Sequence, residues 1–184
     1  MKEMNIDLLV RQVQAGKTKK FEKIIDHYKN RLYGYIFRQV KNKEDAEDIL
    51  QEVFIKVYRK LDLYDPEQNF TSWIVTICRN TVMDHFRRKT PDNELIDHID
   101  LVDQETPERV FMAGTFSKLL DNKIDQLPGK YRDLILLKYF EDQSYDEIAL
   151  TLGIPKNQVK WQLHQARKKL MGLAETEVKL WNAK

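Results

Sequence analysis

The chain has 184 residues, of which 42% are hydrophobic and 33% are charged, a composition that supports packed cores and excludes disordered and fibrous proteins. The formal net charge is only +2, so the total charge alone does not indicate a polyanionic partner. Only 6 Gly and 5 Pro are present, and hydrophobic residues recur mostly at three- and four-residue intervals. We therefore expect an all-α protein.

The sequence carries no sign of secretion or membrane insertion. The single cysteine, Cys78, excludes an internal disulfide framework, and the first residues lack the apolar stretch of a secretory signal. The longest apolar runs fall far short of the ~20 residues that a membrane-spanning helix requires. We expect a cytoplasmic protein.

Charge divides the chain into three parts. Residues 1–90 hold 18 Lys and Arg against 13 Asp and Glu, residues 91–110 hold 1 against 7, and residues 111–184 hold 12 against 9. Prolines at 91 and 107 interrupt helices on either side of the acidic part. We predict two small helical domains, 1–90 and 113–184, joined by an acidic flexible linker at 91–112, which is either a solvated tether or a segment with a role of its own.

Two amphipathic helices are predicted in the first domain. In the first, hydrophobic residues recur at helical spacing from Phe21 to Ile36, and the second runs from about Glu44 to Leu61. The core-facing residues of the second are Ala46, Ile49, Leu50, Val53, Val57 and Leu61. Its opposite side carries an acidic stripe, made of Glu44, Asp48, Gln51, Glu52, Ile55 and Arg59. A solvated surface would explain this stripe, but an outward-facing Ile suggests a partner that covers it.

A turn-rich loop, residues 64–69, precedes a third helix predicted from about Phe70 to Lys89. The polar side of this helix ends in a cationic cluster and contains Asn80, Asp84, Arg87, Arg88 and Lys89. The cluster could simply complement the helix dipole. However, the aromatic residues Tyr64 and Phe70 at the two ends of the loop suggest stacking surfaces beside cations, which are typical of sites for an unpaired nucleic-acid strand.

The last part of the chain contains a predicted helix-turn-helix. Ser144 and Glu147 have the spacing of a capping box, in which each side chain accepts a hydrogen bond from the backbone of the other. Gly153 then stands where a left-handed residue ends a helix, and Pro155 starts the next helix. The small Ala149 allows the two helices to cross closely.

The second helix of this motif has one hydrophobic side, with Val159, Leu163 and Ala166, and one polar side. Between residues 156 and 170 it carries only cations among its charged residues, which suits DNA phosphates. Its neutral polar residues could read bases, each good contact discriminating by ~1–3 kcal/mol, although Trp161 could instead contact another domain. The predicted DNA-facing residues are Lys156, Asn157, Lys160, Trp161, His164, Gln165 and Lys168.

Together these motifs resemble the extracytoplasmic-function (ECF) sigma factors of bacterial RNA polymerase. Residues 45–54 (DAEDILQEVF) are similar to the family's polymerase-binding helix. Residues 70–74 (FTSWI), with Arg79, Asn80 and residues 84–89 (DHFRRK), are similar to its promoter-melting segment. Residues 127–132 (LPGKYR) and the helix-turn-helix are similar to its promoter-reading domain. The resemblance covers nearly the whole chain.

The resemblance implies an alternative-sigma initiation factor that binds core RNA polymerase, directs it to promoters and helps to melt the minus-ten region. It implies polymerase contacts at Asp45, Asp48, Gln51, Glu52 and Ile55. It implies minus-ten contacts at Tyr64, Asn69, Phe70, Arg79, Asn80, Asp84, Arg87, Arg88 and Lys89, with a flipped base captured by loop 64–69. The expected partners are core polymerase, double-stranded and locally melted promoter DNA, and an anti-sigma factor. No cofactor or metal is expected, and the free protein is expected to be a monomer.

The DNA-facing helix departs from the family pattern. Family members commonly have a small residue where Asn157 stands, Ser or Thr where Trp161 stands, and Arg where Gln162 and Gln165 stand. The family's base contacts therefore do not transfer directly, and we predict an atypical minus-thirty-five element.

The main alternative is a helix-turn-helix regulator whose N-terminal block is a sensor or dimerisation domain. It explains the last part of the chain equally well, but not the melting-type loop and helix, and it would normally need a dimer to bind two half-sites. An enzyme has little support, because the four histidines are scattered and no phosphate-binding glycine loop or suggestive carboxylate pair occurs.

Overall fold

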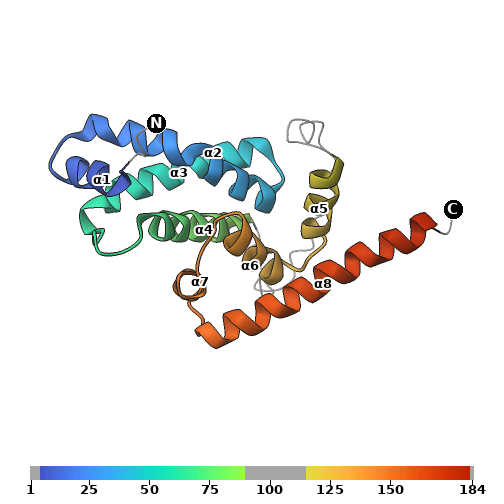
Figure 1. Ribbon diagram of the computed structural model, residues 1–184. Coiled ribbons are helices and arrows are strands. Elements are labelled where there is room, and N and C mark those ends of the chain that lie inside the picture. Colours follow the sequence, from blue (N-terminus) through green and yellow to red (C-terminus); the bar gives the residue numbers. More distant parts are fainter. Residues whose placement is uncertain (1–4, 90–114, 183–184) are drawn as a thin grey trace. The chain divides into compact units, whose positions relative to one another are not determined.

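The computed structural model describes residues 5–89 and 115–182 (Figure 1). Within these ranges the regular structure is entirely helical, which confirms the predicted all-α fold. The chain divides into two compact units, Met1–Asp92 and Asn93–Lys184, and each is described by itself. The predicted linker, 91–112, lies outside the described residues.

Over residues 5–89, unit 1 forms a bundle of four α-helices with two short 3₁₀ turns. Helix α2 packs against both α3 and α4, and α1 packs against α2 and beside the η2 turn (Figure 1). The elements, in chain order, are α1 (Ile6–Gln14), η1 (Thr18–Lys20), α2 (Phe21–Val40), α3 (Lys43–Lys60), η2 (Leu61–Leu63) and α4 (Phe70–Lys89).

The core of unit 1 follows the predicted hydrophobic faces. On α2 the side chains of Ile24, Leu32 and Ile36 are fully buried. On α3 the buried side chains are Ala46, Ile49, Val53, Phe54 and Val57, whereas Leu50 is only half-buried. The amphipathic pattern therefore placed the core of this unit well, with a small error at the edge of the α3 face.

Local sequence fixes the boundary between α2 and α3. Lys41 ends α2 with a left-handed backbone (φ 55°). Asn42 then caps α3, because its Oδ1 accepts a hydrogen bond from the Asp45 backbone N–H at 2.9 Å. The two acidic residues Glu44 and Asp45 lie in the first turn of α3, where the helix dipole favours negative charge.

Unit 2 contains the predicted helix-turn-helix. Its elements are α5 (Thr115–Asp125), α6 (Gly129–Tyr139), α7 (Tyr145–Leu152) and α8 (Lys156–Asn182). Helix α8 packs against α6 and α7, and the buried Val159, Leu163 and Ala166 form its inner side. Helices α7 and α8 correspond to the two predicted helices of the motif.

The two ends of α7 have the chemistry that the sequence predicts. Ser144 Oγ accepts a hydrogen bond from the Glu147 N–H at 3.2 Å, and Glu147 Oε2 accepts one from the Ser144 N–H at 2.7 Å. Gly153 ends α7 with a left-handed backbone (φ 66°), a conformation that favours glycine. Both ends of α7 are thus fixed by local residues, which confirms the predicted capping box.

The junction of α5 and α6 is held by a buried arginine. Arg132 donates hydrogen bonds to the backbone carbonyls of Ile124, Asp125 and Leu127. These carbonyls lie at or just beyond the end of α5, where the helix offers no further backbone N–H groups to bond them. A cationic donor there stabilises the C-terminus of α5 and fixes α6 beside it.

Of the helices described, none combines the length and apolar character needed to cross a membrane.

Candidate functional site

The outer side of α3 presents the predicted acidic stripe. Asp48 and Gln51 are exposed, and Ile55 has 51% of its surface exposed. Asp45 and Glu52 are only half-exposed, because they face α4. The stripe is therefore a solvent-facing surface with a hydrophobic side chain among polar ones, as the sequence predicts.

A network of ion pairs joins α3 to the cationic end of α4. Asp45 Oδ2 lies 2.6 Å from Lys89 Nζ, and Glu52 Oε2 lies 2.9 Å from Arg88 Nη2. Lys56 Nζ also contacts Glu52 Oε1 at 2.8 Å. The sequence predicted two separate sites here, a polymerase contact and a DNA contact. The structure places their charged groups in direct contact across the α3–α4 interface.

The network changes the acidity of its members. Hydrogen bonds from Lys56, and then from Arg88, hold the pKa of Glu52 below its ordinary value of 4.5, against the opposing effect of burial. Burial lowers the pKa of His85, and this outweighs the opposing attraction of Asp45, whose carboxylate lies 3.7 Å away. Glu52 is thus held as a carboxylate, while His85 favours its neutral form.

Loop 64–69 connects η2 to α4, and the aromatic residues on either side of its exposed part, Tyr64 and Phe70, are buried. Tyr64 and Phe70 each have only 3% of their surface exposed, so the prediction that they offer stacking surfaces is wrong. Their rings lie 5.2 Å apart at 90°, and the Tyr64 ring lies 5.0 Å from that of Trp73. Hydrophobic burial of these large rings against each other outweighs exposure to solvent. They form the floor of the loop.

The exposed residues of the loop, 65–69, are ordered by their own hydrogen bonds. The Tyr64 hydroxyl donates to the Gln68 carbonyl. Asp65 Oδ1 accepts from the Glu67 N–H at 3.0 Å, and Asn69 Oδ1 accepts from the Ser72 N–H at 3.1 Å, which caps α4. Burial raises the pKa of Tyr64 to about 12, so its phenol stays protonated as a donor near neutral pH. The loop is therefore pre-shaped.

The remaining predicted residues of α4 lie along its polar side. Asn80 is exposed and Arg79 is half-buried. Asp84 is shared between two cations, at 3.0 Å from Arg87 Nη1 and 3.4 Å from Lys56 Nζ. Lys56 was not among the predicted residues, although its position four residues after Glu52 is a known signal for a helical ion pair.

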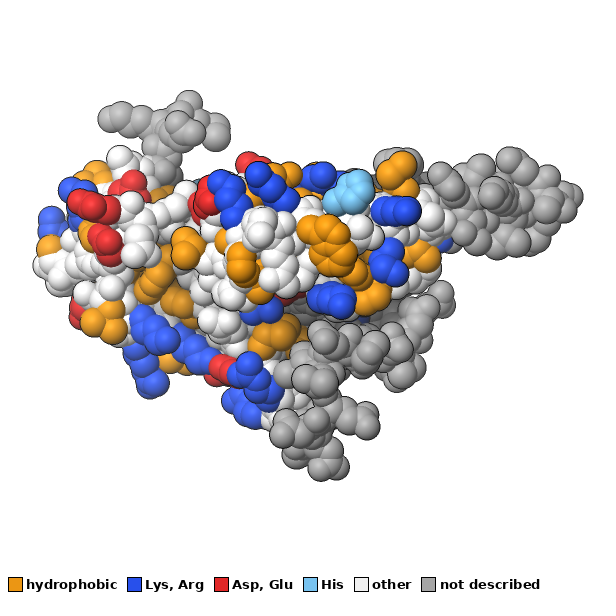
Figure 2. Space-filling model, turned by 90° about the horizontal axis from the view of Figure 1, so that it is seen from below, with side chains coloured by type: hydrophobic (Ala, Val, Ile, Leu, Met, Phe, Trp, Pro, Cys, Tyr) orange, Lys and Arg blue, Asp and Glu red, His pale blue; other side chains and the backbone are white. Residues whose placement is uncertain are grey.

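The outer side of α8 is cationic and largely exposed. Asn157, Lys160, His164 and Lys168 are exposed, Gln165 is half-buried, and Trp161 has 60% of its surface exposed. In the view from below, Lys and Arg side chains lie around a histidine and hydrophobic side chains (Figure 2). Lys156 is exposed but pairs with Asp146 of α7 at 2.7 Å.

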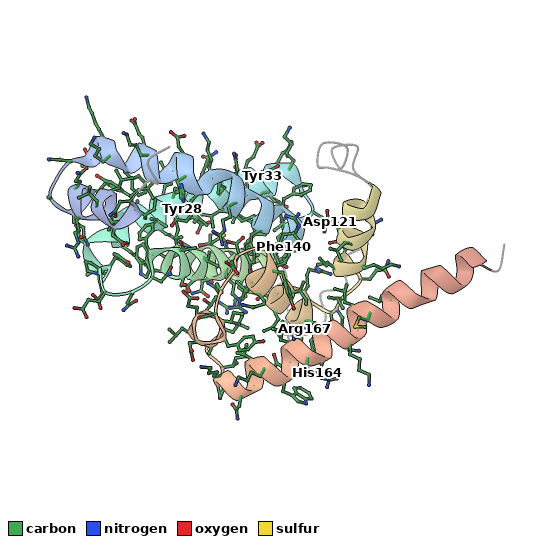
Figure 3. All side chains as sticks on the ribbon, in the orientation of Figure 1. Tyr28, Tyr33, Asp121, Phe140, His164 and Arg167 are labelled. Atoms are coloured by element: carbon green, nitrogen blue, oxygen red, sulfur yellow. The ribbon has the colours of Figure 1, made fainter. Side chains whose placement is uncertain are left out.

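Arg167 and His164 leave α8 on different sides. Figure 3 shows His164 pointing away from the rest of unit 2, whereas Arg167 points toward α6. Arg167 Nε donates to the Tyr139 hydroxyl at 2.6 Å, and its guanidinium lies 5.6 Å from the centre of that ring. Arg167 thus holds α8 against α6 and presents the other side of α8 to solvent. The sequence pattern did not predict this role of Arg167.

Comparison with known proteins identifies both units. Residues 24–91 match the family described as sigma-70 region 2, and residues 117–170 match sigma-70 region 4. The chain is 34% identical to the ECF RNA polymerase sigma factor SigW of Bacillus subtilis, over 91% of this chain and 96% of that protein. It is 32% identical to the RNA polymerase sigma-H factor of Pseudomonas aeruginosa, over 86% of this chain and 88% of that protein. The chain belongs to the ECF sigma factors.

Solved structures support the fold of this sigma factor. It is similar to CnrH in complex with the cytosolic domain of CnrY, with a TM-score of 0.71 and 20% identity over 92% of this chain and 97% of that one. It is also similar to RpoE in complex with the anti-sigma factor NepR from Bartonella quintana, with a TM-score of 0.69 and 21% identity over 85% and 98%. The alternative of a helix-turn-helix regulator is not favoured, because a region 2 match accompanies the region 4 match.

Proposed function

We propose that this ECF sigma factor binds core RNA polymerase, directs it to specific promoters and helps to melt the minus-ten region. The observation that carries the proposal is the order of two sigma regions along one chain, each with an exposed surface of the chemistry that its task requires. The role is that of an initiation factor rather than an enzyme, and it is exercised in the cytoplasm, where polymerase and chromosomal DNA are found.

The domain boundaries that we propose are 1–90 for polymerase binding and minus-ten recognition, 91–112 for the acidic linker, and 113–184 for minus-thirty-five recognition. The linker's excess of acidic residues suits a channel that otherwise holds a polyanion.

The polymerase contact is assigned to the acidic stripe of α3 together with the neighbouring Asp45. Its proposed residues are Asp45, Asp48, Gln51, Glu52 and Ile55. The exposure of Ile55 supports this assignment, since a partner that covers the stripe would bury a hydrophobic side chain that is 51% exposed to water. Charged residues at the rim would favour association through electrostatic complementarity with a basic partner.

Promoter melting is assigned to loop 64–69 and the polar side of α4. A flipped base costs a few kcal/mol to extrude, which contacts to the exposed loop residues must offset. Tyr64 and Phe70 contribute as the buried floor, not as stacking surfaces. The proposed contacting residues are Asn69, Arg79, Asn80, Asp84, Arg87, Arg88 and Lys89, with the cations serving the phosphates of the separated strand.

Minus-thirty-five recognition is assigned to the outer side of α8. The proposed residues are Lys156, Asn157, Lys160, Trp161, His164, Gln165 and Lys168. Lysines would position α8 on the phosphates, while Asn157, Gln165 and Trp161 would contact base edges in the major groove.

An anti-sigma factor is a further proposed partner. CnrH and RpoE, which share the fold, were each solved with a protein bound, and that protein is an anti-sigma factor for RpoE. The same exposed surfaces in this chain would be available to such an inhibitor in the free protein.

Reconstituted transcription tests this function. Purified protein and core polymerase are incubated with a promoter library randomised at both elements, and run-off transcripts are sequenced. We expect enrichment of a two-part promoter that is transcribed only when both proteins are present. The proposal would be contradicted if the protein opened promoter DNA without core polymerase. A stable dimer bound to two half-sites would also contradict it.

A further inference from the structure

We propose that Gln14 of α1 is a positioning residue for loop 64–69, and that α1 is therefore part of the promoter-melting apparatus. This inference rests on the function proposed above. The region 2 match begins at residue 24, so α1 lies before the segment that the family description covers.

The geometry that carries the inference is a two-point contact. Gln14 Nε2 lies 2.9 Å from the Leu61 carbonyl oxygen and 3.2 Å from the Tyr64 carbonyl oxygen. Leu61 is the first residue of η2, and Tyr64 is the first residue of loop 64–69. One side-chain amide thus fixes both ends of the turn that leads into the loop, across 47 and 50 residues of sequence.

The donor itself is held rigidly. Leu9, Val10 and Val13 are buried on the inner side of α1, so hydrophobic packing fixes the helix that carries Gln14. Figure 1 shows α1 at the end of unit 1 where the chain passes from α3 to α4. The Gln14 amide can bond both carbonyls because its NH₂ group carries two N–H donors, whereas a carboxylate offers none.

The receiving end is continuous with the loop. Tyr64 is the buried residue whose ring packs on Phe70 and Trp73 and whose hydroxyl donates to the Gln68 carbonyl. A displacement of the Tyr64 backbone therefore moves the loop at both of its ends. Pre-shaping matters for a captured base, since ordering the loop during binding would reduce affinity.

The isosteric variant Gln14→Glu tests the inference. Its carboxylate keeps the size of the side chain but cannot donate to either carbonyl. Gln12→Glu is the matched control, because Gln12 lies on the same helix, gains the same charge and, in the part of the chain that the structure describes, does not donate to η2. Each full-length variant is combined with core polymerase and the promoter enriched in the selection above, and opening is followed by permanganate modification of unpaired thymines.

For Gln14→Glu we expect opening to fall about tenfold, which corresponds to the loss of one to two hydrogen bonds. Binding to core polymerase and to the closed promoter should match those of Gln12→Glu at a temperature where both are folded. A merely structural role would lower the melting temperature and leave opening by the folded protein unchanged.

Equal opening by the two folded variants would overturn the inference, as would a Gln14→Glu variant that loses core binding and opening together. The variant Asn80→Ala distinguishes a failure of the positioning role of Gln14 from a failure of the proposed melting function. If Asn80→Ala abolishes opening while Gln14→Glu does not, the positioning role fails and the proposed function stands. If neither variant affects opening, the assignment of melting to loop 64–69 and the polar side of α4 fails as well.

Discussion

At the scale of the residue, Trp161 is one of the side chains predicted to depart from the family pattern. It is 60% exposed on the outer side of α8, between Lys160 and His164. An exposed indole offers a flat apolar surface to thymine methyl groups and one N–H donor, whereas the Ser or Thr common in the family offers a small hydroxyl.

We predict that the double variant Trp161→Ser with Gln165→Arg changes the preferred minus-thirty-five sequence. A promoter library randomised at that element, transcribed with core polymerase, measures the change. Because Trp161 is largely exposed, its replacement alone should alter the free energy of unfolding by no more than about 0.5 kcal/mol. An unchanged sequence preference would show that the two side chains do not read bases.

For Tyr64 we predict a large effect on stability instead, because its ring is buried. Tyr64→Ala removes a large side chain from contact with Phe70 and Trp73 and should destabilise unit 1 by about 3 kcal/mol. Tyr64→Phe loses only the hydrogen bond to Gln68 and should cost about 1 kcal/mol. Urea unfolding measures both values. If Tyr64→Ala left stability unchanged, the ring would be an exposed stacking surface after all.

At the scale of the element, the pairing of α3 with α4 depends on pH through Glu52. Its pKa is below 4.5 in the folded protein, so the folded state binds fewer protons to this group than the unfolded state does near that pH. The stabilisation by Lys56 and Arg88 is therefore complete above pH 4.5 and is lost as the pH falls through the lowered folded pKa.

We accordingly predict that Glu52→Gln destabilises unit 1 at neutral pH, and that the difference from the unaltered protein shrinks below pH 4.5. Urea unfolding of both proteins from about pH 7 to about pH 3 measures it. High salt should also reduce the difference, because the pairs are partly exposed and therefore screened. A difference that stays constant over the whole pH range would contradict the ion-pair account.

The elements that sequence reasoning predicted well are those fixed locally. The bounds predicted for α4, Phe70 to Lys89, agree with the structure, and so do the capping box at Ser144 and the left-handed Gly153. Side-chain burial on α8 also followed its periodicity, with Val159 and Leu163 inside. In each case the cause lies within a few residues along the chain, where helical periodicity and capping chemistry act.

What sequence reasoning missed depends on contacts between distant residues. The pairing of Glu52 with Arg88 spans 36 residues, and the bonds from Gln14 span 47 and 50. The burial of Tyr64 likewise follows from packing with Trp73, which composition cannot distinguish from an exposed aromatic pair. Tertiary packing decides such features, so a pattern read along one helix does not reveal them.

At the scale of the whole molecule, we propose that two steps of initiation fall to two separately described units. Unit 2 would hold duplex DNA through α8, and unit 1 would hold the separated strand through loop 64–69 and α4. The two steps can therefore be impaired separately, by a substitution in one unit or the other, without a change in the fold of either.

The most direct test measures promoter binding and opening by Lys160→Ala and Asn80→Ala in reconstituted transcription, with Lys19→Ala, an exposed lysine on η1, as control. We predict that Lys160→Ala weakens binding to the closed promoter, that Asn80→Ala binds but fails to open it, and that Lys19→Ala behaves as the unaltered protein. If Lys160→Ala and Asn80→Ala both start transcripts as well as the unaltered protein, the account is contradicted.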